Sequence, residues 1–194
     1  MSGKEDILAI TADLFYVNGY NNTGLAEILD KCNLAKTSLY HHFGSKAGLG
    51  LAYLEMMKED LFNRISLWTS KRKSLSEYLS KWVWYIKKSI KEEKFHGCPF
   101  ASFAYQLSTA DVEIFSPKME EISQDWIKQL SNYVIDLQEK GKIRKDANAK
   151  DIALDMLSTY QGYVTLWKLT RNIKHIEMMD RKFKEIARNV ETIA

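Results

Sequence analysis

The chain contains few of the residues that interrupt helices or cross-link loops. Its 194 residues include two prolines, nine glycines and two cysteines. Cys32 and Cys98 lie far apart and have no CxxC spacing, which argues against a disulfide framework or a zinc site and favours a reducing cytoplasm. With so few breakers, and with Leu, Ile, Lys, Glu and Ala abundant, the composition predicts an all-α fold.

Long hydrophobic runs and catalytic patterns are missing as well. No apolar stretch approaches the ~20 residues that a membrane span needs, and the N-terminal segment carries acidic residues, so we expect neither a membrane segment nor an export signal. The histidines supply neither a nucleophile with its base nor metal-ligand spacing; they are His41, His42, His96 and His175. The sequence therefore predicts a cytoplasmic protein that is not an enzyme and has no metal or cofactor.

A large excess of positive charge is also absent, because the formal net charge is only +3. Residues 1–50 contain four lysines against five carboxylates. Residues 31–46, by contrast, contain three lysines, two histidines and no carboxylate. A surface that attracts nucleic acid must therefore be local to this stretch.

The first 31 residues contain two amphipathic segments. Apolar side chains at helical spacing predict a helix over residues 4–18, which Gly19 ends. Thr23 is the expected N-cap of a short second helix that runs to about Lys31. Both helices are expected to point their apolar residues at one shared core.

A third short helix follows across a tight turn. Asn33 readily accepts the left-handed conformation that such a turn needs. In the helix over residues 34–43, Leu39 and Phe43 lie four apart and face inward. The outward positions carry only polar or aromatic side chains, which is typical of the second helix of a helix-turn-helix that reads the DNA major groove.

The segment over residues 19–49, GYNNTGLAEILDKCNLAKTSLYHHFGSKAGL, resembles the signature region of the tetracycline-repressor (TetR) family of regulators. The resemblance implies a DNA-binding domain over residues 1–48, in which Thr23 and Lys46 touch phosphates at helix starts. It places the remaining DNA-binding residues in or beside the major groove: Lys36, Thr37, Ser38, Tyr40, His41 and His42. Ser45 is a good N-cap for the next helix, whose first N–H groups would help Lys46 hold a phosphate.

Two residues depart from the family pattern. Ala35 stands where a capping serine is usual, and Asn33 where glycine is common; losing a cap costs ~1 kcal/mol of helix stability. The alternatives are that Tyr40 and His42 pack beside Phe43 as a small apolar patch, or that the three helices form a cap that does not bind DNA.

Residues 49–194 are expected to form a helical ligand-binding and dimerisation domain, which makes about nine helices in all. The expected helices cover residues 51–69, 76–94, a short segment after Pro99, 117–140, 149–171 and 175–192. The basic residues 71–73 are interpreted as a solvated loop, with DNA contact as the alternative.

The body is rich in aromatic residues that, by the family resemblance, could line an inducer pocket or else pack as ordinary core. The candidates are Trp82, Tyr85, Phe100, Phe103, Trp126, Tyr133, Tyr160, Tyr163 and Trp167. Polar edges are few, namely His96, Gln106, Thr159 and Gln161, which favours an apolar or aromatic small molecule. Cys98 is a candidate thiol sensor, with a buried inert cysteine as the alternative.

The last two helices are apolar over faces too broad for one core contact, which predicts a partner surface. The resemblance implies a homodimer built on these helices, and a twofold dimer reads an inverted-repeat operator. The ligand is then expected to disturb the spacing of the two reading helices, about 34–36 Å for adjacent turns of DNA, and to release the operator. The alternative is a DNA-binding adaptor whose body binds a protein instead of a small molecule.

Overall fold

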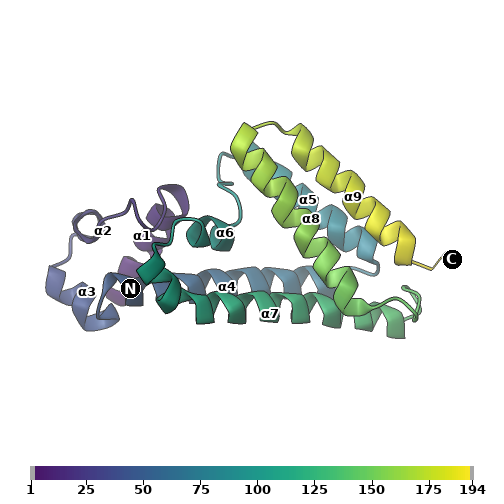
Figure 1. Cartoon of the computed structure of the whole chain (residues 1–194), viewed down its shortest axis with the longest axis horizontal. Coiled ribbons are helices and arrows are strands. Elements are labelled where there is room, and N and C mark those ends of the chain that lie inside the picture. The colour runs from purple at the N-terminus through teal and green to yellow at the C-terminus, as the bar shows by residue number, and fades with distance from the viewer. Residues whose placement is uncertain (1–2, 193–194) are drawn as a thin grey trace. The chain divides into compact units, whose positions relative to one another are not determined.

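The structure is a computed structural model that describes residues 3–192, and the all-α prediction is confirmed in it (Figure 1). Its helices are α1 (Gly3–Val17), α2 (Leu25–Cys32), α3 (Lys36–Phe43), α4 (Lys46–Lys71), α5 (Leu75–Lys91), α6 (Pro99–Ala104), α7 (Thr109–Glu139), α8 (Ala149–Thr170) and α9 (Lys174–Val190). Within residues 3–192, no helix combines the length and the apolar character that crossing a membrane requires.

The described residues form two compact units. The first unit takes in the chain up to Asp60 together with Cys98–Ile122, and the second takes in Leu61–Gly97 and the residues from Ser123 onward. Helices α4 and α7 each contribute to both units. Neither unit is therefore a single continuous stretch of sequence, and the expected division after residue 48 stays a prediction.

The turns of the first unit have the expected chemistry. Gly19 has φ +93° just after α1, and Asn33 has φ +51° between α2 and α3. The Asn33 backbone N–H donates to the Asp30 carbonyl at 3.1 Å, which ends α2 in a left-handed cap. Asn33 supplies the turn between the two helices of a helix-turn-helix, and Gly19 turns the chain between α1 and α2.

Apolar side chains from α1 to α4 meet in one core inside the first unit. Ile7, Ile28, Leu39 and Leu49 are completely buried, and Leu14 is nearly so. Each such burial stabilises the fold by roughly 1.5–3 kcal/mol. Leu39 thus fixes which face of α3 looks inward and which faces solvent.

Helix α7 begins earlier than the sequence analysis expected. The expectation placed its start at Pro117, but the helix starts at Thr109 and Pro117 lies inside it. Ser108 caps the helix: its Oγ accepts from the Asp111 N–H at 3.2 Å and donates to the Asp111 carboxylate at 2.6 Å. This reciprocal cap stabilises a start that the proline had obscured.

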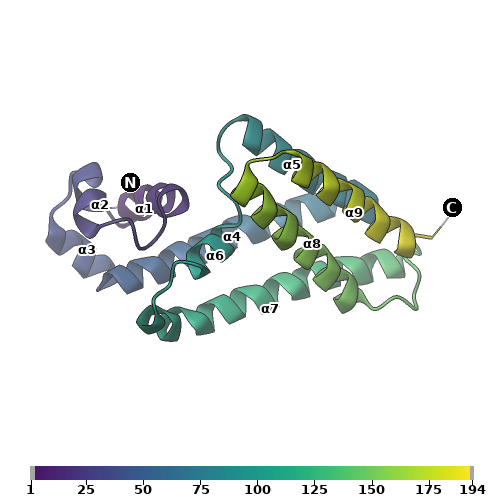
Figure 2. The same cartoon turned by 45° about the horizontal axis from the view of Figure 1, so that its top comes forward.

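The second unit is organised around α5, α8 and α9. Helices α8 and α9 lie side by side, and α5 packs against α9 (Figure 2). Tyr78 on α5, Met156 on α8, and Met179 and Phe183 on α9 are almost fully buried. Residues 143–144 and 190–192 close the unit through a bridge between Ile143 and Glu191.

Candidate nucleic-acid interface

The exposed side of α3 carries a compact group of polar and aromatic side chains. Lys36, Thr37, Tyr40, His41 and His42 are exposed, and we call these five residues the reading face. The Lys36 Nζ lies 5.5 Å from the centre of the Tyr40 ring, a cation–π distance. The reading face therefore presents ammonium, hydroxyl and imidazole groups, which are the donors and acceptors that base edges and phosphates bind.

The predicted members of the interface differ in how open they are. Ser38 is half-buried, whereas its neighbours on the reading face are exposed. Ala35 caps α3 with extended backbone and no side-chain hydrogen bond, as the sequence indicated. The first N–H groups of α3 thus lack a side-chain cap.

The expected cap at Thr23 is wrong. Gly24 is the N-cap of α2, and the completely buried Thr23 hydroxyl donates to the Gly19 carbonyl at 2.8 Å instead. Thr23 therefore links the end of α1 to the start of α2. Its phosphate contact stays a prediction, and its side chain is the least accessible of the eight DNA candidates.

The start of α4 has the geometry expected for a phosphate contact. The Gly48 N–H donates to the Ser45 Oγ at 3.0 Å, so Ser45 caps the helix as predicted. Lys46, the first residue of α4, is half-buried, and its Nζ lies 4.7 Å from the centre of the Tyr20 ring. Burial lowers the pKa of Lys46, while the attraction of Asp111 opposes that shift.

Tyr20 belongs to an aromatic cluster that the sequence analysis missed. Its ring centre lies 5.3 Å from that of Phe15, 4.9 Å from Phe103 and 5.3 Å from Phe115, and Tyr53 joins the same group. We call these five residues the head aromatic cluster. They come from α1, α4, α6, α7 and the α1–α2 turn. Because these elements are far apart in the sequence, no local pattern predicts the cluster.

Hydrogen bonds tie α6 to the α1–α2 turn within the same unit. The Asn21 side-chain amide donates to the Gln106 carbonyl, and the Gln106 amide donates to Ser102 at 2.9 Å. The Gln106 side chain lies directly over Gly19, where a Cβ would be 2.0 Å from it. Gln106 was a candidate polar edge of an inducer pocket; in the structure its side chain lies against this turn.

The predicted inducer residues fall into several groups. Trp82, Trp126 and Tyr160 are brought together, with the Trp82 ring centre 5.0 Å from Tyr160 and 6.3 Å from Trp126. Phe183 of α9 adds a fourth ring at 5.4 Å from Trp82. We call these four residues the body aromatic cluster, and their role in ligand binding stays a prediction.

The other inducer candidates lie outside this cluster. Phe100 and Phe103 belong to the first unit. Tyr85 packs on Trp68, and Trp167 packs on Phe95. The remaining candidates are Tyr133, whose hydroxyl donates to the Ser74 carbonyl at 3.0 Å, and Tyr163, which is half-buried.

Several large apolar side chains are exposed on α8, α9 and the turn between them. Leu154, Leu166, Leu169, Ile173 and Met178 are each between 38% and 75% exposed. We call this group the α8–α9 apolar face. These residues lie on the helices for which the sequence predicted a partner surface, and that surface stays a prediction.

Potential metal ligands do not gather in the part of the chain that the structure describes. Over residues 3–192, no three His, Cys, Asp or Glu side chains come close enough to hold an ion. Cys98 is buried and Cys32 is half-buried, and burial is the main cause that raises the pKa of the Cys32 thiol.

Two family models match the chain. One, described as "Bacterial regulatory proteins, tetR family", matches residues 7–53. The other, described as "Tetracyclin repressor-like, C-terminal domain", matches residues 72–183, which is more than half of the 194 residues.

Individual relatives agree with these matches. The chain is 27% identical over 170 residues to the transcriptional repressor DhaR of a Mycobacterium species, covering 87% of this chain and 84% of the relative. The descriptions of this relative and of the family models name regulators. They lend no support to the alternative of a DNA-binding adaptor whose body binds a protein partner.

Solved structures show the same fold over the whole chain. Reduced NemR of Escherichia coli superposes with a TM-score of 0.79 at 20% identity, covering 100% of both chains. A TetR-family regulator of Cytophaga hutchinsonii superposes with a TM-score of 0.84 at 18% identity, covering 98% of this chain and 96% of the other.

Proposed function

Because this chain belongs to the TetR family and is a DNA-binding transcriptional regulator, we propose that it is a repressor that binds an inverted-repeat operator as a homodimer and leaves it when a small molecule binds. A regulator of this kind acts where the chromosome lies, in the cytoplasm. The ligand would be a largely apolar or aromatic molecule.

The reading face of α3 carries this proposal. Five neighbouring exposed side chains offer hydrogen-bond donors and acceptors, and the buried Leu39 on the other side of the helix holds their orientation. Lys46 begins α4 immediately after the Ser45 cap, so its charge and the first N–H groups of α4 support a phosphate contact. Base contacts then specify the operator, while phosphate contacts set the register.

The α8–α9 apolar face supports the homodimer. Leu169 is 75% exposed and Leu166 is 42% exposed, although both lie on a helix whose opposite side is core. A second copy of the same face would bury these leucines in a twofold interface. Two reading faces related by that axis would meet two half-sites of an inverted repeat.

The body aromatic cluster supports an aromatic or apolar inducer. Trp82, Trp126 and Tyr160 form a group of buried rings in contact with one another in the second unit, and an apolar or aromatic ligand that displaced part of this packing would be surrounded by aromatic surface. An inducer that binds the DNA-free arrangement more tightly would shift the dimer away from the operator.

The experiment that tests the operator is selection of bound sequences from a pool of random duplexes by the purified protein, repeated at several salt concentrations. Enrichment of an inverted repeat is the expected result. If no sequence is enriched even at low salt, the proposal of a specific regulator is wrong.

The selected operator then tests the reading face. Tyr40→Ala combined with Lys46→Ala should weaken operator binding by at least about tenfold, because one base-reading ring and one phosphate contact are lost in each subunit. The matched control is Tyr105→Ala with Lys94→Ala, which removes one tyrosine and one lysine that are each 76% exposed elsewhere. Fluorescence anisotropy measures both variants; equal affinity of the test variant and the control would contradict the proposed reading face.

A further inference from the structure

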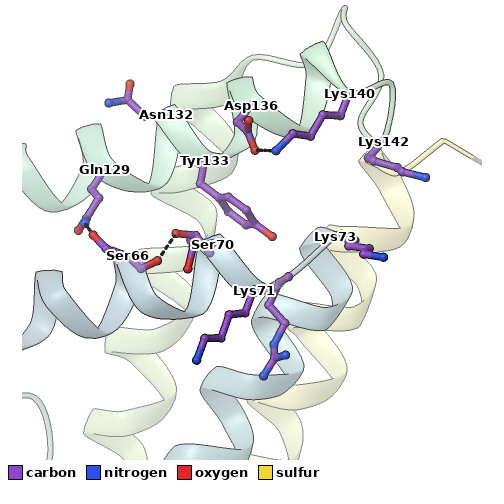
Figure 3. Close-up of a pocket in the computed structure, with 12 residues that line it drawn as sticks. Ser66, Ser70, Lys71, Lys73, Gln129, Asn132, Tyr133, Asp136, Lys140 and Lys142 are labelled. Carbon is purple, nitrogen blue, oxygen red and sulfur yellow. Dashed lines mark hydrogen bonds and ion pairs between the residues drawn. The ribbon is translucent and has the colours of Figure 1, made fainter.

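A basic pocket lies at one end of the second unit, and none of its lining residues belongs to the body aromatic cluster. It has a volume of about 750 Å³ and is lined by the last turn of α4, the α4–α5 turn, the C-terminal part of α7 and the residue after Gly141. Figure 3 shows the Tyr133 ring extending from α7 into the space between these segments. The Tyr133 hydroxyl donates to the Ser74 carbonyl at 3.0 Å and so closes the floor of the pocket.

Positive side chains converge on this pocket. The five cations among its lining residues are Lys71, Arg72, Lys73, Lys140 and Lys142. The lining residues include one carboxylate, that of Asp136. Its Oδ2 lies 2.6 Å from the Lys140 Nζ and so neutralises one of the five positive charges. The nearby Glu77 carboxylate accepts from the Lys73 backbone N–H at 2.9 Å as part of the α5 cap.

The negative ends of the helix dipoles offset only part of this positive charge. Both α4 and α7 end at the pocket, and a helix C-terminus carries roughly half a negative charge. The two dipoles together therefore offset about one positive charge. Asp136, Glu77 and Glu191 all act on Tyr133, and α5 begins at the pocket with its positive N-terminus. When these charges are counted as well, about one to two positive charges remain for an anion to neutralise.

The walls of the pocket are held in place by hydrogen bonds between helices. The Gln129 side-chain amide on α7 donates to the Phe62 carbonyl at 3.1 Å and to the Ser66 Oγ at 2.9 Å, both on α4. These bonds connect the two helices beside the pocket and so keep the pocket open between them.

We propose that the basic pocket binds a small, multiply charged organic anion of the phosphate-ester or polycarboxylate class. Its volume is within the 300–1,000 Å³ range typical of small-molecule sites. A concave site with cations on several sides suits a compact anion better than a DNA duplex, whose phosphates lie along a convex surface. The lining residues include none of the reading face, and Tyr133 is the one residue that they share with the inducer candidates.

Calorimetric titration of the full chain with inorganic pyrophosphate and, in a second arm, with citrate tests this site. The test variant is Lys71→Gln, Lys73→Gln and Lys142→Gln together, all exposed lysines of the pocket rim. The matched control, with the same change in net charge, is Lys91→Gln, Lys128→Gln and Lys150→Gln, which are exposed lysines outside the pocket.

The expected result is saturable binding of at least one probe, weakened about tenfold or more in the test variant and unchanged within about twofold in the control. Preference for pyrophosphate assigns the site to phosphate esters, and preference for citrate assigns it to polycarboxylates. Circular dichroism melting shows that both variants remain folded.

Three outcomes would overturn the proposal. The first is that the wild-type chain binds neither probe. The second is an equal loss of affinity in the two triple variants, which would reduce the effect to general surface charge. The third is that pyrophosphate binding is absent and the test variant loses affinity for a duplex of unrelated sequence, which would make these lysines a nucleic-acid contact. The titration contains no operator, so failure of the proposed repressor function leaves its result intact.

Discussion

At the scale of single residues, Gly50 illustrates how closely the first unit is packed. A Cβ at this position would lie 2.9 Å from the Phe115 ring and 3.1 Å from the Tyr20 ring. Both rings belong to the head aromatic cluster and are buried, so neither can move aside freely. The absence of a side chain at residue 50 is therefore a requirement of packing, since the position lies within a helix where glycine is otherwise unfavourable.

We expect Gly50→Ala to lower the free energy of unfolding by about 1–3 kcal/mol, the usual cost of overpacking. Gly162→Ala is the control, because this glycine also lies inside a helix and no atom lies within 4 Å of a Cβ there, so the change should stabilise the fold by up to about 1 kcal/mol. Urea denaturation of both variants measures the difference; equal stabilities would show that the aromatic rings give way easily.

Tyr20 should make stability depend on alkaline pH. Burial raises the pKa of Tyr20 to about 12, and Asp111 adds to the rise. The folded state therefore keeps the phenol proton that the unfolded state loses near pH 10, so stability is intact below pH 10 and falls as the pH rises toward 12.

Tyr20→Phe should reduce that loss of stability, because the ring remains in the head aromatic cluster and the titrating hydroxyl is gone. Urea denaturation at several pH values between 9 and 12 measures the slope, which should be shallower by up to about 1.4 kcal/mol per pH unit in the variant. Tyr105→Phe is the control, since Tyr105 is 76% exposed. Identical slopes for the wild type and Tyr20→Phe would contradict the role of Tyr20.

At the scale of elements, most helices could be predicted from sequence because apolar spacing and end signals agree. Gly19, Asn33 and Ser45 each end or begin a helix as predicted, through left-handed backbone or a side-chain cap. Two helix starts were wrong. Thr23 turned its hydroxyl inward, and at α7 the proline at position 117 was a stronger signal than the serine at 108.

The reciprocal cap at the start of α7 gives the next prediction. Ser108→Ala removes the Oγ that accepts from the Asp111 N–H, so we expect a loss of about 1 kcal/mol in unfolding free energy. Ser116→Ala is the control in the same helix, because that exposed hydroxyl donates only to the Val112 carbonyl of its own helix. Thermal melting compares the two variants, and an undisturbed Ser108→Ala protein would show that the cap does not stabilise α7.

The parts of the candidate sites that the sequence could not predict depend on long-range contacts. The reading face follows from local helical periodicity, so its exposed residues were foreseeable. The head aromatic cluster joins Phe15 to Phe115, and the basic pocket joins Lys71 to Lys142. Neither separation leaves a local pattern, and the basic loop at residues 71–73 was accordingly interpreted as solvated.

At the scale of the whole molecule, the proposed dimer links the α8–α9 apolar face to DNA binding. Leu166→Glu with Leu169→Glu places two charges on that face, and burying them in a twofold interface would be costly. We expect the variant to be monomeric in analytical ultracentrifugation and to bind the operator at least about tenfold more weakly, because half-sites would be occupied independently.

The control for the dimer is Leu67→Glu with Ile135→Glu, which alters two exposed apolar residues on α4 and α7. This variant should keep the sedimentation of the wild type. If the Leu166→Glu and Leu169→Glu variant dimerises as strongly as the wild type, the dimer interface lies on another surface.

The discontinuous first unit also determines when the reader can be completed during protein synthesis. Phe103 and Phe115, which pack on Phe15 and Tyr20, are translated about ninety residues after them. A nascent chain that ends before residue 122 therefore lacks part of the first unit, although all of α1, α2 and α3 has been made. The first unit can therefore be completed only after more than half of the chain has left the ribosome. A segment of residues 1–48 transferred to another protein would lack the aromatic residues that pack on it.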